Sequence, residues 1–155
     1  MLLNPKSVAL GPTKTSRRLN ALEVTGKDSQ AATIAYSTLG QIFGTEYGRR
    51  SKGTDKGGNG LVRRRYFLFL DASNEPVGTA SLHALGNTLA VHDVGIVDVH
   101  RGMGYGRELM GWLLGQCQRD MRVYLQCEKG WHTEFYESCG FELIHERTGY
   151  ERLET

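Results

Sequence analysis

The stretch from Val91 to Trp112 constrains the fold more than any other part of the chain. An apolar run ends at Arg101, three closely spaced glycines follow, and an amphipathic pattern begins directly after them. This order predicts a strand, a tight loop and a helix. The glycines leave the loop few side chains, so its backbone N–H groups can approach a ligand while the helix contributes the positive end of its dipole. The stretch therefore predicts an anion-binding site.

The spacing of the glycines narrows the kind of anion site. The third glycine comes one residue too early for a dinucleotide-binding turn, and no Gly-Lys-Ser/Thr follows, as a nucleotide-triphosphate loop would require. What remains is the pattern Arg101-x-x-Gly104-x-Gly106 behind a predicted strand. A second motif, F-Y-E-S-C-G-F over residues 135–141, follows after one further predicted strand. The two motifs in this order are more specific than either is alone.

Together these motifs resemble the GNAT superfamily, the acyl-CoA-dependent N-acetyltransferases. The pyrophosphate loop of that family has the pattern Gln/Arg-x-x-Gly-x-Gly/Ala, and F-Y-E-x-x-G-F closes its cofactor site. The resemblance implies an α/β (α+β) fold: a mixed, mostly antiparallel central sheet of six to seven strands, with a splayed parallel pair and helices on both faces. It also implies that residues 1–155 form a single acetyltransferase domain.

Length and composition fit this expectation. A chain of 155 residues suits one domain, and its 39% hydrophobic content is ordinary for a globular protein. The longest apolar runs, such as Tyr66 to Leu70, are too short to span a bilayer, and the start M-L-L-N-P-K-S lacks the apolar core of a secretion signal. We therefore expect a soluble, cytoplasmic protein.

The periodicity along the chain predicts the remaining elements. Residues 1–18 are expected to form a peripheral arm and residues 44–60 a flexible basic loop. Helices are expected from the Asp28/Ser29 cap to Phe43, from the glycine loop to near Asp120, and over 131–139. Strands are expected over 20–25, 66–71, 77–85, the stretch between Asn87 and the glycine loop, 121–127 (parallel to its predecessor), 141–146 and 148–153.

The segment from Arg49 to Arg65 is strongly basic. Its seven Lys and Arg residues face a single carboxylate, Asp55. Such a cluster suits a nucleic acid or an acidic partner, and it equally suits a solvated loop whose charges bind nothing specific. Aromatic residues for base stacking are few, which argues against a single-strand binding groove.

The resemblance assigns the binding of acetyl-CoA to backbone groups. The expected pyrophosphate site runs through Arg101, Gly102, Met103, Gly104, Tyr105, Gly106 and Arg107, with Arg101 either touching phosphate or orienting the loop. Near Ile96 the strand is expected to bulge and to splay from the strand that contains Val123. Backbone groups of Val94 and Ile96 would then bind the pantetheine amides and polarise the thioester carbonyl.

Two side chains are candidates for proton transfer. By resemblance, Tyr136 of the second motif protonates the departing thiolate, which suits a phenol that keeps its proton at neutral pH. His92 is the candidate base, and Asp93, which points to the opposite face if the strand is regular, is the alternative. A packed tyrosine and a structural histidine are the other interpretations. The remaining histidines show no ligand spacing, so we expect no metal.

Three cysteines, at 117, 127 and 139, form no C-x-x-C pair. Buried reduced thiols are the favoured interpretation, with a regulatory or acyl-carrying role as the alternative.

The sequence thus predicts an N-acetyltransferase that moves an acetyl group from acetyl-CoA to a primary amine by direct attack in a ternary complex. The acceptor is expected to be a small molecule or a protein, and no membrane partner is expected. Nucleic acid is a weaker candidate, and the chain is expected to be a monomer or a homodimer. The alternative hypothesis is a non-catalytic acyl-CoA-binding regulator, or a nucleic-acid-associated module that uses residues 49–65.

Overall fold

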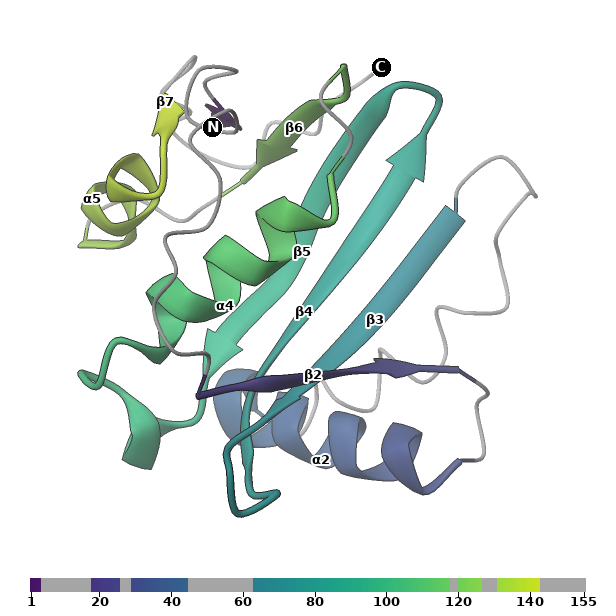
Figure 1. Ribbon diagram of the computed structural model, residues 1–155, viewed down its shortest axis with the longest axis vertical. Helices are drawn as coiled ribbons and strands as arrows, with labels where there is room; N and C mark the ends of the chain where they lie inside the picture. Colours follow the sequence, from purple (N-terminus) through teal and green to yellow (C-terminus); the bar gives the residue numbers. More distant parts are fainter. Residues whose placement is uncertain (4–17, 26–28, 45–62, 118–119, 127–130, 143–155) are drawn as a thin grey trace.

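A computed structural model describes residues 1–3, 18–25, 29–44, 63–117, 120–126 and 131–142. Seven strands form one sheet in the order β2-β3-β4-β5-β6-β1-β7 (Figure 1). The strands are β1 (Leu2–Leu3), β2 (Asn20–Val24), β3 (Arg63–Leu70), β4 (Pro76–Leu85), β5 (Thr88–Ile96), β6 (Arg122–Leu125) and β7 (Phe141–Glu142). The helices are α2 (Gln30–Phe43), the short 3-10 helix η1 (Asp98–His100), α4 (Tyr105–Gly115) and α5 (Trp131–Ser138).

Strands β2 to β5 are antiparallel neighbours. Short polar turns join β3 to β4 and β4 to β5. Between β3 and β4, the Asp71 carboxylate accepts hydrogen bonds from the backbone N–H groups of Ser73 (2.8 Å) and Glu75 (3.0 Å). Between β4 and β5, Gly86 takes the left-handed conformation at φ 58° that a two-residue hairpin turn requires. After β5 the chain crosses through α4 and returns as β6, so β5 and β6 are parallel.

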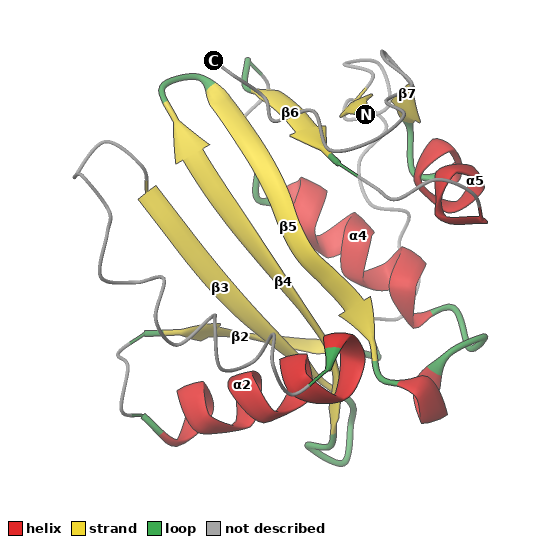
Figure 2. Ribbon diagram, turned by 180° about the vertical axis from the view of Figure 1, so that it is seen from behind, coloured by secondary structure: helices red, strands yellow, loops and turns green. Residues whose placement is uncertain are grey.

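The two faces of this sheet are covered by different helices, α4 in front in Figure 1 and α2 in front in Figure 2. Alternate residues of a strand point to opposite faces. Phe67 and Phe69 of β3 meet Trp112 of α4 edge-on, with ring centroids 5.0 and 5.5 Å apart. The residues that alternate with them, including Tyr66, therefore face α2.

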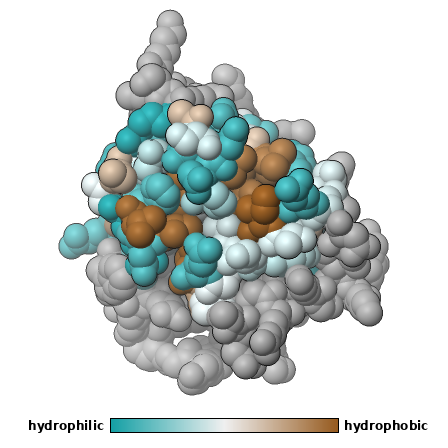
Figure 3. All heavy atoms as spheres, turned by 90° about the horizontal axis from the view of Figure 1, so that it is seen from below, coloured by the Kyte–Doolittle hydropathy of each residue, from teal (hydrophilic) through white to brown (hydrophobic). Residues whose placement is uncertain are grey.

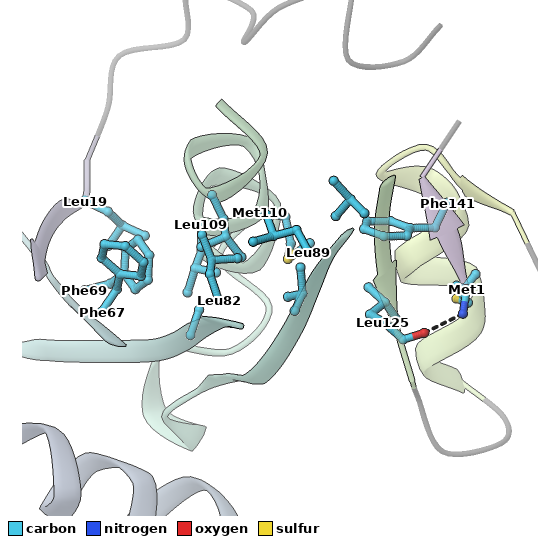
Figure 4. Packing of buried hydrophobic residues seen from close by; sticks show 14 of the residues in the cluster. Met1, Leu19, Phe67, Phe69, Leu82, Leu89, Leu109, Met110, Leu125 and Phe141 are labelled. Carbon is cyan, nitrogen blue, oxygen red and sulfur yellow. Dashed lines mark hydrogen bonds between the residues drawn. The ribbon is translucent and has the colours of Figure 1, made fainter. Parts of the chain in front are cut away.

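The α4 face holds the main hydrophobic core (Figure 4). Leu109, Met110 and Leu113 of α4 are fully buried against residues such as Phe69 and Leu82 of the sheet. At the far side of the core the amino group of Met1 donates to the carbonyl of Leu125, which ties β1 to β6.

Strand β5 and helix α2 touch with no room for a side chain between them. A Cβ at Gly95 would lie 2.4 Å from Cγ2 of Ile42, so the last turn of α2 packs on the bare backbone of β5. At Gly78 of β4 a Cβ would lie 2.5 Å from the carbonyl oxygen of Gly95. These contacts fix the end of β5 relative to its neighbours.

Most predicted elements are confirmed. Ser29 caps α2, because its hydroxyl accepts a hydrogen bond from the N–H of Ala32 at 3.1 Å. The prediction that the helix after the glycine loop runs to Asp120 is wrong. Helix α4 ends at Gly115, where the N–H groups of Gln116 and Cys117 turn back to carbonyls three residues earlier and tighten the last turn.

Two expectations at the ends of predicted loops are also wrong. Leu2 and Leu3 pair with β7, and Leu2 also with Tyr124 of β6, so the first residues belong to the sheet and not to a peripheral arm. Residues 63–65, the end of the basic segment 49–65, belong to strand β3 and not to a loop, because their backbones pair with β4. Residues 4–17 of that arm, the loop over 45–62 and the final hairpin beyond residue 142 lie outside the described residues.

None of the helices described here is long and apolar enough to cross a membrane.

Replacing Leu109 by Ala should lower the free energy of unfolding by about 2–5 kcal/mol, because the change leaves a cavity at a fully buried position. Denaturant unfolding followed by circular dichroism measures this. Leu85→Ala is the matched control: Leu85 is 54% exposed, so its loss should cost less than about 0.5 kcal/mol. Equal losses in the two variants would contradict the assignment of the core.

Candidate acyl-transfer site

The parallel strands β5 and β6 stay paired over only part of β5. Pairing runs from Thr88–Arg122 to Val91–Leu125, where β6 ends, and β5 then continues to Ile96 with only β4 paired to it. Figure 2 shows β6 beside only the first part of β5. The predicted splayed pair is therefore confirmed, and in the described part of the chain no strand lies beside residues 92–96 on the β6 side. We call this open edge of β5 the gap.

A bulge interrupts β5 beside this gap. Thr79 pairs with Gly95 and Ser81 pairs with His92, so Ala80 alone stands opposite two residues of β5. One of these two, Asp93, has a left-handed φ of 55°. The predicted bulge is confirmed.

Two buried hydroxyls hold the bulge. Thr79 donates to the carbonyl oxygen of Asp93 at 2.9 Å, and Ser81 donates to the Asp93 carboxylate at 3.2 Å. The expectation that Asp93 lies on the face opposite His92 is wrong, since the bulge turns its carboxylate toward Ser81, which faces α2. The two hydroxyls therefore fix both the backbone and the side chain of Asp93 in the bulge.

The loop after β5 is tied back to the strand by Arg101. Its Nε donates to the carbonyl oxygen of Ile96 at 3.0 Å, and its Nη1 lies 2.8 Å from the Asp98 carboxylate. Asp98 is 77% exposed, so the ion pair itself adds little stability. In this geometry Arg101 orients the loop, and the Ile96 carbonyl already has a donor.

Glycine geometry shapes the start of α4. Gly102 and Gly104 take left-handed φ angles of 76° and 82°, and Gly104 is the residue immediately before the helix. A Cβ at Gly106 would lie 3.3 Å from the ring of Phe135, so this glycine allows α5 to pack against the first turn.

The first turn of α4 presents backbone donors. The first helical hydrogen bond runs from the N–H of Glu108 to the carbonyl of Gly104. Consequently the N–H groups of Tyr105, Gly106 and Arg107 have no acceptor within the helix and point out of its N-terminus. Together with the helix dipole they form the anion site that the sequence predicts.

Arg18 is a residue of this site that sequence reasoning missed. Its guanidinium lies 4.3 Å from the Tyr105 ring centroid and donates to the carbonyl oxygen of Met103 at 2.8 Å. Nε of Arg18 donates to the Glu108 carboxylate at 3.2 Å, and the same carboxylate accepts a hydrogen bond from the N–H of Leu19 at 3.0 Å. No local pattern could reveal this contact, because it joins residues far apart in the chain.

Tyr136 lies on α5 at the edge of the core. Its ring contacts those of Phe135 and Phe141 edge-on, with centroids 5.2 and 6.1 Å apart. Arg107 of α4 donates to the Ser138 hydroxyl at 3.2 Å. Helix α5 is thus fixed to the turn of α4 that carries the free amides.

On the α2 face, His92 stacks on a second histidine. The rings of His92 and His83 are 4.3 Å apart and inclined by 29°. Burial is the main cause that lowers the pKa of His83 to about 4, and the charges of His92 and Arg64 lower it further. Burial also lowers the pKa of His92, although the residue is solvent-exposed; Asp93 acts in the opposite direction, and the charge of Arg64 lowers the pKa further. Both rings are therefore neutral at neutral pH.

The thiols are poor nucleophiles where they are described. Burial raises the pKa of Cys117 to about 11 and also raises the pKa of Cys139. Both are free and half-buried, and Cys127 lies outside the described residues. Within the part of the chain that the structure describes, no three His, Cys, Asp or Glu side chains are arranged to hold a metal ion.

A splayed parallel pair beside a glycine loop and a free helix N-terminus defines the acetyltransferase class of α/β fold. The sequence model of the Acetyltransferase (GNAT) family matches residues 31–141, well over half of the chain. The chain therefore belongs to the acetyltransferase (GNAT) family. A comparison with curated proteins finds no match.

Solved structures agree on the fold. The ribosomal-protein-S18-alanine N-acetyltransferase of Escherichia coli is 14% identical, with a TM-score of 0.66 over 88% of this chain and 85% of that one. An acetyltransferase of Trypanosoma brucei is 20% identical, with a TM-score of 0.52 over 87% and 99%. A functionally unknown conserved protein of Staphylococcus epidermidis ATCC 12228 is 16% identical, with a TM-score of 0.65 over 90% of this chain and 54%, about half, of that one.

His83 should make stability depend on pH. Because its pKa is lower in the folded state than the usual 6.5, the unfolded chain binds more protons between pH 6.5 and 4. Its contribution is complete above pH 6.5 and is lost as the pH falls toward 4. After discounting for solvent screening we expect on the order of 1 kcal/mol.

Urea unfolding at pH 7.0 and pH 4.5, in the wild type and in His83→Phe, isolates this contribution from that of the carboxylates. The variant should lose less stability between the two pH values than the wild type does. An identical loss in both proteins would contradict the shift.

Proposed function

We propose that this protein transfers an acetyl group from acetyl-CoA to a primary amine by direct attack in a ternary complex. The observation that carries the proposal is the gap between β5 and β6 with the outward-pointing amides of α4 at one end of it. A donor with a diphosphate and a long uncharged arm suits such a site, because the charged part meets the helix N-terminus and the arm meets unpaired strand backbone.

The residues around the loop fit coenzyme A. Backbone N–H groups from Gly102 to Arg107 would hold the diphosphate, with Arg18 as an additional cation beside them. Seen from below, the described surface has separate hydrophobic patches among hydrophilic residues (Figure 3). Val99 and Met103, in the connection between β5 and α4, are apolar side chains that are 79% and 56% exposed. They suit the uncharged parts of the donor. When bound, acetyl-CoA supplies an activated acetyl thioester.

His92 and Tyr136 are assigned to proton transfer. The attacking nitrogen must expose its lone pair, and a neutral imidazole at His92 can accept the proton that blocks it. Tyr136 donates its phenolic proton to the departing sulfur as the nitrogen–carbon bond forms and the carbon–sulfur bond breaks. The amine nitrogen loses two protons in the reaction. His92 accepts one and passes it to water, and the other returns Tyr136 to its protonated state.

The central test is release of the coenzyme A thiol in the presence of a panel of amines. The panel should contain amino acids, polyamines, lysine peptides and peptides that begin with alanine, since the Escherichia coli structural relative is named for an alanine acceptor. Amine-dependent thiol release supports the proposal. Tight acetyl-CoA binding without release for any amine would favour the non-catalytic regulator.

The alternative nucleic-acid module gains little from the described residues. Arg64 and Arg65 are neighbours on β3, so they face opposite sides of the sheet and do not add to one basic surface. Arg65 is also paired with Glu23 through two contacts of 2.8 and 3.0 Å. Salt-dependent binding of nucleic acid would be needed to revive this hypothesis.

Gly104→Val should weaken coenzyme A binding by roughly 10- to 100-fold, because a β-branched residue at φ 82° costs about 1–3 kcal/mol and displaces the amides. Isothermal titration calorimetry measures this. Gly111→Ala, in the middle of α4 with open space around it, should bind normally. Normal binding by Gly104→Val would remove the basis for the anion site.

Tyr136→Phe should lower kcat by about 10²-fold with little change in KM for acetyl-CoA, because it removes only the proton donor. Steady-state kinetics at pH 7 to 9 measures both constants. Unchanged kcat would assign the proton to water and leave Tyr136 a packing role.

A further inference from the structure

His83 and His92 form a pair that no local sequence pattern announces. They lie on adjacent strands, and the register places His92 opposite Ser81, two residues before His83 on β4. Because cross-strand partners share a face, both rings lie on the α2 face, opposite the core around α4. This pair is therefore on the other side of the sheet from the core that supports the anion site.

The position of His92 along β5 places the histidine pair beside the gap. Val91 is the last β5 residue paired with β6, so His92 is the first residue beside the gap. An amine that approached from the α2 face would meet this ring where the strands part.

The surroundings hold the pair from several elements. The Ser81 hydroxyl is fully buried and lies 3.4 Å from Nε2 of His83 and 3.2 Å from the Asp93 carboxylate. On β3, the Tyr66 ring meets His83 edge-on at 6.2 Å, and Arg64 lies opposite His83 in the register. Helix α2 contains no Asp, Glu, Lys, Arg or His.

The charged and titratable groups that face His92 are thus Asp93 on its own strand and His83 and Arg64 across the sheet. Asp93 favours a proton on the imidazole, and Arg64 opposes it. A ring stacked on one face and open on its edge can offer a single nitrogen to the acceptor.

We propose that His83 is a positioning residue that stacks on His92 and holds its ring, dry on one face, at the acceptor side of the gap. This inference rests on the proposed function and deepens it, since it states how the base is kept oriented and uncharged. The stacking surface of His83 does this, and its nitrogens are not required.

The experiment compares His83→Ala, which removes the stacked ring, with His83→Phe, which keeps it. In His83→Ala, kcat should fall about tenfold, as expected from loss of an aromatic pair, with KM for acetyl-CoA unchanged. Water then reaches His92, so the acid limb of the pH profile should move to higher pH, toward the pKa of a free imidazole. His83→Phe should keep kcat within about threefold and retain the wild-type acid limb.

Leu85→Ala is the matched control, because it removes an exposed side chain from the same strand and face two residues away. It should leave kcat and the acid limb unchanged. Coenzyme A affinity and the melting temperature of each variant show whether the fold is intact.

Two outcomes would overturn the inference. Wild-type kcat and pH profile in His83→Ala would show that the stack does nothing for the base. Equal losses in His83→Ala and His83→Phe would show that a nitrogen of His83 is needed.

An NMR titration of His92 separates this inference from the proposed function. The pKa of His92 should rise in His83→Ala and not in His83→Phe, whether or not any amine is acetylated. A wild-type protein without turnover would reject the acetyltransferase proposal, while an unshifted His92 in His83→Ala would reject the positioning role alone.

Discussion

The site depends on the bulge at Asp93 more than on any single side chain of the loop. A regular β5 would keep its pairing register with β4 and send each later residue to the other face. The extra residue instead resets the strand just beyond its last pair with β6. Thr79 and Ser81 make this stable, because their buried hydroxyls bond to the carbonyl and the carboxylate of the residue that takes the left-handed conformation.

The same region shows why small residues occur there. Gly95 lets α2 pack directly on β5, and Gly78 lets the β4 backbone pass close to the carbonyl of Gly95. A methyl group at Gly95 would push α2 away from β5, and one at Gly78 would clash with the carbonyl oxygen of Gly95 on the neighbouring strand. The glycines of the loop serve a different need, since Gly102 and Gly104 supply left-handed turns that aim the helix N-terminus outward.

The sequence predicted those features whose cause is local. Ser29 as a cap and the strand-loop-helix order both follow from neighbouring residues, and the structure confirms them. The predictions from the sequence were wrong where a feature depends on strand register or on contacts between residues far apart in the chain. The face of Asp93 depends on one extra residue in the ladder, and the pairing of Leu2 with β7 joins opposite ends of the described chain.

The described end of the basic segment shows the same dependence on strand geometry. Counting charges over 49–65 ignored the alternation of a strand, which sends Arg64 and Arg65 to opposite faces once β3 begins at Arg63. The contact of Arg18 with Met103 and the stack of His83 on His92 were equally invisible, because both bring together residues from separate elements. The site could be located from the sequence, whereas the partners of its residues could not.

The anion site and the candidate base His92 require opposite electrostatic environments, and they lie apart along β5. The anion site needs positive potential, whereas a base must stay uncharged until it meets a proton. The register places His92 opposite Ser81 and Ile96 opposite Gly78, so the bulge shortens their separation to three steps along β4, roughly 10 Å at about 3.3 Å per residue. The interaction between charges weakens with distance, so an anion at the start of α4, which follows Ile96 in the chain, should favour protonation of His92 less than the groups beside the ring do. His83, Arg64 and Asp93 are closer, and the protonation of His92 is therefore decided on the α2 face.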